Sequence, residues 1–298
     1  MIIPADTKDV KGPQGPPPMQ TTNPFPNPIL EQEAYPHDLP PYSETDAGSE
    51  TRSIHHPPPP PQQPLQPVQP VQRIPESNAI NAHSEVKING PMHVLGSVKS
   101  SSHVELKNGI EVDGKVTSSG HVILSNNVIV HEKVDSSGHI TLFDGVNVSG
   151  KLSASGSVEL RNGVFVGDKV DASGSVTIDG GELGCKIAGK ISASGSVNIK
   201  GNVKVGDDIK TSGRVTLQQY CNGLLTIGGN IKTSGGVTVE GNVVFENDLY
   251  LSGGLTINGH LYCKKDFEAK GNVYLNPGSQ LVVDGKRTIH GSLKETTA

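Results

Sequence analysis

The chain has 298 residues, of which 33% are hydrophobic and only 4% aromatic, and its net charge is −5. This balance gives no electrostatic case for binding nucleic acid or an anionic membrane, and no stretch approaches the roughly 20 apolar residues of a transmembrane helix. The start "MIIPADTKDV" lacks the charged and apolar regions of a secretory signal, and three cysteines are too few for a disulfide framework. We therefore expect a cytoplasmic protein with at most slight membrane contact.

Composition divides the chain near residue 78. Twenty of the 22 prolines precede that point, but only three of the 36 glycines do, and residues 1–78 hold nine acidic against four basic residues. Such a segment cannot bury enough apolar surface to offset the entropy of ordering its backbone. We expect residues 1–78 to form a disordered, acidic, Pro-rich arm, whereas residues 79–298 are neutral overall, with 21 basic and 21 acidic residues.

The arm contains two candidate partner motifs. In "PPPPPQQPLQPVQPVQR" every third residue from Pro61 is a proline, which places these prolines on one edge of a polyproline II helix. SH3, WW or profilin-like domains bind such edges, and "LPPY" resembles a WW ligand. The alternative is that the arm is only a spacer. The motif residues are Leu39, Pro40, Pro41 and Tyr42, and Pro61, Pro64, Pro67 and Pro70.

A repeat occupies the rest of the chain. From Gly120 to Gly271 a glycine recurs at intervals of 18, 18, 18, 21, 18, 22, 18 and 18 residues. Each interval of eighteen contains three six-residue units, such as "HVILSN", "NVIVHE" and "KVDSSG". A fixed period of this length is the signature of a solenoid, in which each repeat stacks on its neighbour.

The hexads predict short strands. Position 2 is almost always aliphatic, position 4 is aliphatic in the first two hexads and small in the third, and position 6 is mostly Gly, Asn or Asp. Alternation indicates a strand with one buried face, and residues at position 6 tolerate turn conformations. Three strands and three corners make one triangular coil. The sequence predicts an all-β, three-sided parallel β-helix with inward positions 2 and 4, and one thinner wall.

About eleven coils are expected between residues 79 and 291, followed by a short tail at 292–298. Three coils exceed eighteen residues, through "GELGCKIAG", "RVTLQQYCNGLLTIGG" and "GSQLVVDG", and such insertions are expected in corner loops. We expect Cys185 and Cys221 in the first two of these loops. Cys263 is expected at an inward position.

Known catalytic motifs are absent. The chain has no nucleophile elbow, Gly-rich phosphate loop, H-E-x-x-H or C-x-x-C, and the long insertions contain no histidine. We expect a protein that is not an enzyme and needs no cofactor. One candidate metal site is the column His103, His121 and His139, which occupies position 1 in three consecutive coils. The alternative, which we favour, is an exposed polar column.

Assembly is the expected property of such a rod. Its two end coils present unpaired strand edges, and no helical or charged cap is evident after "KRTIHGSLKETTA". Tyr250, Tyr262 and Tyr274 add outward-facing aromatics near the C-terminal end, either as local packing or as a contact surface. The predicted polymer interface comprises Val86, Ile88, Met92 and Val94 at one end and Tyr274, Leu275, Leu281 and Val283 at the other.

The repeated strings "SASGSVEL", "KVDASGSVTIDG" and "GKISASGSVNIKGNVKVGDDI" resemble those of the bactofilins, a polymer-forming cytoskeletal family, over residues ~79–291. The resemblance implies a right-handed three-sided β-helix that polymerises end to end without nucleotide and serves as a cytoplasmic scaffold. This chain departs from the family in its number of coils and in its long Pro-rich arm. The "SGS" strings also resemble repeats of adhesin-like surface proteins, which is the alternative function.

Overall fold

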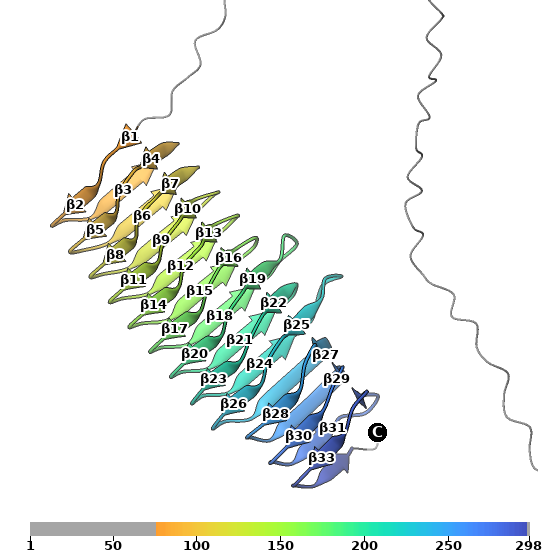
Figure 1. Cartoon of the computed structure of the whole chain (residues 1–298). Coiled ribbons are helices and arrows are strands. Elements are labelled where there is room, and N and C mark those ends of the chain that lie inside the picture. The colour runs from red at the N-terminus through yellow and green to blue at the C-terminus, as the bar shows by residue number, and fades with distance from the viewer. Residues whose placement is uncertain (1–75, 297–298) are drawn as a thin grey trace, which may run out of the picture. The chain divides into compact units, whose positions relative to one another are not determined.

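Residues 76–296 are described by the computed structural model, and they form a parallel β-solenoid without helices (Figure 1). The arm motifs at 39–42 and 61–70 lie outside this range. The described residues include no helix with the length and apolarity needed to cross a bilayer. Strands begin at Glu76 and end at Glu295, slightly beyond both expected limits of the solenoid.

The strands lie on three sides, each a ladder of parallel strands one coil apart. Side 1 consists of β3 (Val86–Asn89), β6 (Val104–Lys107), β9 (Val122–Ser125), β12 (Ile140–Phe143), β15 (Val158–Arg161), β18 (Val176–Asp179), β21 (Val197–Lys200), β24 (Val215–Gln218), β31 (Val273–Leu275) and β34 (Leu293–Glu295). Side 2 consists of β1 (Glu76–Ser77), β4 (Met92–Val94), β7 (Ile110–Val112), β10 (Ile129–Val130), β13 (Asn147–Val148), β16 (Phe165–Val166), β19 (Cys185–Ile187), β22 (Val203–Val205), β25 (Leu225–Ile227) and β32 (Gln280–Val283).

Side 3 has twelve strands, one per coil, and therefore gives one coil more than the eleven expected. They are β2 (Ile80–Ala82), β5 (Val98–Ser100), β8 (Val116–Ser118), β11 (Val134–Ser136), β14 (Leu152–Ala154), β17 (Val170–Ala172), β20 (Ile191–Ala193), β23 (Ile209–Thr211), β26 (Ile231–Thr233), β28 (Leu249–Leu251), β30 (Phe267–Ala269) and β33 (Arg287–Ile289). Sides 1 and 2 join into one sheet because β27 (Val237–Phe245) and β29 (Leu255–Cys263) run straight through the corner between them.

Inward side chains form aliphatic ladders, as predicted from positions 2 and 4. On side 1, Val122, Ile140 and Val158 pair in direct register in consecutive coils. Each is at most 1% exposed, and so are most inward residues of the middle coils. Burying a Val, Leu or Ile side chain in this way contributes roughly 1.5–3 kcal/mol, so the ladders supply most of the driving force for folding.

The small inward residues of side 3 have two consequences, of which the sequence indicated only the first. Small inward residues such as Ala154 leave a shallow outer groove of about 800 Å³ along this side. Where the small residue is Ser136, its hydroxyl also donates a 2.6 Å hydrogen bond to the carbonyl of Gly120, and it accepts one from the amide of Gly138 at 3.0 Å. The amide of Gly138 also donates to the carbonyl of Gly120 at 3.0 Å, so the hydroxyl adds a side-chain link to a corner whose backbone groups are already paired.

Two kinds of corner hold the coils in register. At the corner between sides 1 and 2, Asn108 and Asp144 adopt positive φ angles of 65° and 59°. The Nδ2 of Asn126 donates to the Oδ1 of Asn108 at 2.8 Å, so the side chains also form a ladder from coil to coil. At the corner between sides 3 and 1, Gly156 lies close to Gly138. A Cβ added to Gly156 would lie 2.8 Å from the carbonyl oxygen of Gly138.

The insertions form corner loops, but one cysteine was wrongly placed in them. Cys185 begins β19 and is 4% exposed, because the extra residues precede it. Its burial raises the pKa of the thiol to about 11, which keeps it neutral. Cys221 does lie in a loop. The preceding residue, Tyr220, donates a hydrogen bond from its hydroxyl to Asp179 at 2.5 Å. Cys263 is buried at an inward position, as expected.

Candidate functional site

Each end of the solenoid presents three strands with a free edge. Within residues 76–296, β1, β2 and β3 at the N-terminal end pair only with β4, β5 and β6. In the same range, β32, β33 and β34 at the C-terminal end pair only with β29, β30 and β31. Both ends therefore expose one unpaired strand per side, which is a template for a further β-strand from another chain. We call these three-strand sets the N-terminal edge and the C-terminal edge.

Apolar side chains at the two edges are incompletely covered. The hydrophobic residues that pack against the core yet remain partly exposed belong to the edge strands or, in the case of Met92, to the adjacent strand β4, with the exception of Ala193 in the middle. In addition, Leu293 on β34 is 38% exposed. The residues of this partly covered set in the end coils are Ile80, Ala82, Ile88, Met92, Leu281, Val283 and Ile289.

Some predicted interface residues lie inside the rod rather than at its ends. Val94 is fully buried because Ser77 of β1 covers it, and Leu275 is only 8% exposed because Glu295 of β34 covers it. Met92 and Tyr274 lie on the same inner strands and are half-buried. Val86, Ile88, Leu281 and Val283 do belong to edge strands. The predicted interface therefore moves outward by one strand at two places: from β4 to β1 at the N-terminal end and from β31 to β34 at the C-terminal end.

The two edges differ in charge, which corrects the expectation that no charged cap exists. Arg287 pairs in register with the inward Phe267, and Glu295 with the inward Leu275. Both charged residues therefore occupy core-facing columns of the last described coil, and both are exposed. On the same two sides of the N-terminal edge, core-facing positions hold the apolar Ile80 and Ile88. Inward charges on an edge strand disfavour stacking on an apolar surface.

The outward tyrosines near the C-terminal end contact neighbouring coils. Lys270 lies over the ring of Tyr250 at 5.3 Å, and Lys294 lies over that of Tyr274 at 5.7 Å. The hydroxyl of Tyr262 donates to Asp284, and this hydrogen bond raises the pKa of Tyr262. These contacts support the interpretation of the tyrosines as local packing of the last coils.

The histidine column is a stack of three rings. The rings of His103, His121 and His139 lie parallel with centroids 4.9 Å apart. Each Nδ1 accepts a hydrogen bond from the backbone amide of the next coil, for example that of His139 to His121 at 3.0 Å. An accepting Nδ1 leaves the proton on Nε2, so neither nitrogen offers a free lone pair to a metal ion. The geometry therefore favours the polar-column interpretation.

Acid should destabilise this column. Burial, His139 and His103 all lower the pKa of His121, in that order, so the folded chain binds fewer protons here than the unfolded chain. The contribution to stability is complete above the unfolded pKa of about 6.5 and is lost as the pH falls through the lower folded value. We expect His121→Ser to reduce the loss of stability between pH 7.5 and 5.5, because the Oγ of Ser157 accepts the equivalent amide hydrogen bond, at 3.2 Å. Urea unfolding at both pH values measures the loss of stability in each protein. An equal loss in the wild type and in His121→Ser would contradict the prediction.

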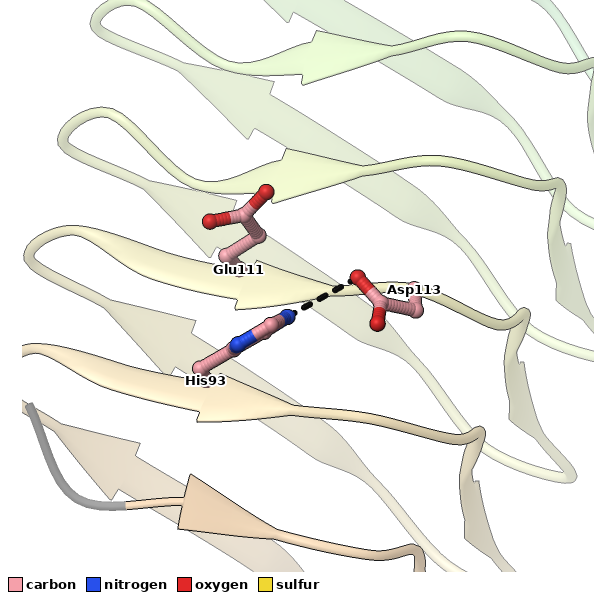
Figure 2. Close-up of side chains that lie close together, drawn as sticks. All are labelled: His93, Glu111 and Asp113. Atoms are coloured by element: carbon pink, nitrogen blue, oxygen red, sulfur yellow. Dashed lines mark hydrogen bonds and ion pairs between the residues drawn. The ribbon is translucent and has the colours of Figure 1, made fainter.

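A second cluster, which the sequence analysis missed, lies beside the N-terminal edge on side 2 (Figure 2). His93 of β4 pairs in register with Glu111 of β7, and its Nε2 lies 2.9 Å from the Oδ1 of Asp113. One coil further, the Nε2 of His131 lies 2.7 Å from the Oε1 of Glu111. The signal in the sequence is a spacing of 18 or 20 residues between imidazole and carboxylate, and it becomes visible once the coil length is known.

Electrostatics of this cluster favour a cation. The hydrogen bond with Asp113 is the largest cause that raises the pKa of His93, and the charges of Asp113, Glu111 and Glu76 add to it. Glu76 is in register with His93 on its other side. All these residues are exposed or half-buried, so the arrangement is a surface site accessible to small ions.

Comparisons with known proteins give no further guide. No protein-family model matches the chain, and neither a curated protein nor a solved structure matches it.

Proposed function

We propose that this protein is a structural, non-enzymatic scaffold that assembles through the two ends of its solenoid, without nucleotide, in the cytoplasm, in the manner of the bactofilins that its repeats resemble. The observation that carries the proposal is the concentration of partly covered apolar residues in the end coils, next to free strand edges. A second chain could supply the missing hydrogen bonds and cover these side chains at the same time.

Head-to-tail stacking has an electrostatic cost. If the C-terminal edge of one copy continued into the N-terminal edge of the next, Arg287 would lie over Ile80 and Glu295 over Ile88, both in core-facing columns. A buried charge without a partner costs several kcal/mol. We therefore infer that like ends meet.

Contact between two C-terminal edges pairs these charges. Consider a two-fold axis that is perpendicular to the rod and passes through the middle of side 2. This axis maps side 2 onto itself and exchanges sides 1 and 3. As a result, β33 of one copy runs antiparallel to β34 of the other. Opposed in this way, Arg287 faces Glu295 of the second copy, and Ile289 faces its Leu293. On side 2, Leu281 faces Val283 of the second copy. Each contact occurs twice, as symmetry requires of an isologous interface.

Contact between two N-terminal edges is apolar. The same operation there opposes β2 to β3 of the second copy, so Ile80 faces Ile88 and Ala82 faces Val86. Alternation of the two contacts would give an open filament without polarity. The arm, whose proline motifs suit SH3, WW or profilin-like domains, would then recruit or space partners along it.

Charge reversal at the C-terminal edge tests the assembly. Arg287→Glu and Glu295→Arg should each limit the full chain to discrete dimers joined at their N-terminal edges, because like charges then face each other. The double variant restores opposite charges across the two-fold axis and should restore filaments. Negative-stain microscopy and sedimentation velocity measure both outcomes.

Two results would overturn parts of this proposal. A double variant that assembles no better than the single variants would exclude the two-fold C-terminal contact. A wild-type chain that stays a monodisperse monomer at high concentration would exclude the scaffold function altogether.

A further inference from the structure

We propose that His93, Glu111 and Asp113 bind a divalent transition-metal ion such as Zn²⁺, which fastens β4 to β7 beside the N-terminal edge (Figure 2). This inference concerns a binding site on the side of the rod, and it stands whether or not the chain assembles.

The backbone already brings the ligand atoms together. One imidazole nitrogen and one oxygen from each carboxylate all lie within 4.8 Å of one another. Zinc binds nitrogen and oxygen ligands at about 2.0–2.2 Å, which in a tetrahedral site places neighbouring ligand atoms about 3.3 Å apart. On binding an ion, the side chains would rotate to close that difference. The strands need not move, because the pairing of His93 with Glu111 is fixed by the β4–β7 ladder.

The neighbouring residues suit a metal site. The Nε2 of His131 lies 2.7 Å from the Oε1 of Glu111, so it can orient that carboxylate from outside the ligand set. Outer hydrogen bonds of this kind hold ligands in position in metalloproteins. The two carboxylates of the cluster lie on neighbouring positions of one coil, where a divalent ion would neutralise both.

The donor set indicates the class of metal. One imidazole and two carboxylates suit Zn²⁺, Co²⁺ or Ni²⁺, with water completing the coordination, whereas Mg²⁺ and Ca²⁺ prefer sets made only of oxygen. The half-buried position of all three ligands leaves room for that water.

Other histidines of the solenoid provide built-in controls. Within residues 76–296 this is the one place where three such ligand atoms gather. His290 and Glu268 repeat the His–carboxylate pair at 2.9 Å near the other end, without a third ligand. His139 belongs to the stacked column, where its Nδ1 accepts the amide hydrogen bond of Ser157 at 2.8 Å.

The test uses the full chain after chelator treatment and dialysis. Isothermal titration with ZnCl₂ should show one site in the wild type that is missing from His93→Gln and from Asp113→Asn. His139→Gln and His290→Gln should keep it. The arm contains His37, His55 and His56, so the quantity that counts is the difference in stoichiometry between the wild type and each variant.

Two further readouts locate the ion. Hydrogen–deuterium exchange should slow on adding Zn²⁺ in β4 and β7 and stay unchanged in β30 and β33. Proton competition should weaken binding at least tenfold between pH 7.5 and 5.5, because His93 must lose its proton. Mg²⁺ at the same concentration should not bind. The proposal would be overturned if His93→Gln and Asp113→Asn bound as many zinc ions as the wild type. It would also be overturned if the controls His139→Gln and His290→Gln lost the same site.

Discussion

Ile88→Asp is expected to stop growth of the assembly at a dimer. Ile88 lies on edge strand β3, packs against the core and is only partly covered. In the proposed contact between N-terminal edges it would be buried against Ile80 of a second copy, so an aspartate there would be a buried charge without a partner. Such a charge costs about 3–5 kcal/mol, and each 1.4 kcal/mol weakens association tenfold. The N-terminal contact should therefore weaken by at least a hundredfold, while the C-terminal contact persists.

A control variant and a double variant show whether the effect of Ile88→Asp is specific to the N-terminal contact. Asn89→Asp adds the same charge to the same strand, but the side chain faces outward and keeps the oxygen that accepts a hydrogen bond from Asn108. It should leave filaments intact. Ile88→Asp combined with Arg287→Glu should give monomers. Monomers from Ile88→Asp alone would instead indicate head-to-tail stacking, and unaffected filaments would exclude the edge as an interface. Sedimentation velocity separates the three outcomes.

Gly156→Ala is expected to destabilise the solenoid by about 1–3 kcal/mol, as overpacking of a close contact does. An added Cβ would lie 2.8 Å from the carbonyl oxygen of Gly138 and 2.6 Å from the Nδ1 of His139. The first of these atoms belongs to the backbone and cannot move without disturbing the register of two coils. Because neighbouring coils stabilise one another, the effect should spread beyond the mutated coil.

Gly236 provides the matched control at a nearby position of the repeat. A Cβ there would meet only the carbonyl oxygen of Gly254, at 3.6 Å, which is an ordinary contact. Gly236→Ala should change the free energy of unfolding by less than about 0.5 kcal/mol. Urea denaturation followed by circular dichroism compares the two variants. Equal stability of both would show that the glycine column does not set the spacing of the coils.

The repeat itself was predictable from the sequence. Alternation of apolar residues over three positions, followed by a turn residue, can be satisfied only by short strands that end at corners, so the inward ladders through Val122, Ile140 and Val158 followed directly. Gly156 also belonged to a visible column. These features were accessible because each depends on neighbours within one hexad or on the same position one coil away.

The tertiary structure alone decided the features that depend on register between different positions of different coils. Insertions shift the numbering, so only the strand pairing placed Arg287 and Glu295 in core-facing columns of the last coil. His93, Glu111 and Asp113 come together because β4 and β7 lie side by side and the side chains point to the same patch. The bond from each backbone amide to a histidine Nδ1 likewise depends on the stacking of the coils. A local pattern determines which face a residue occupies, whereas contacts across coils are set by the accumulated register of the whole stack.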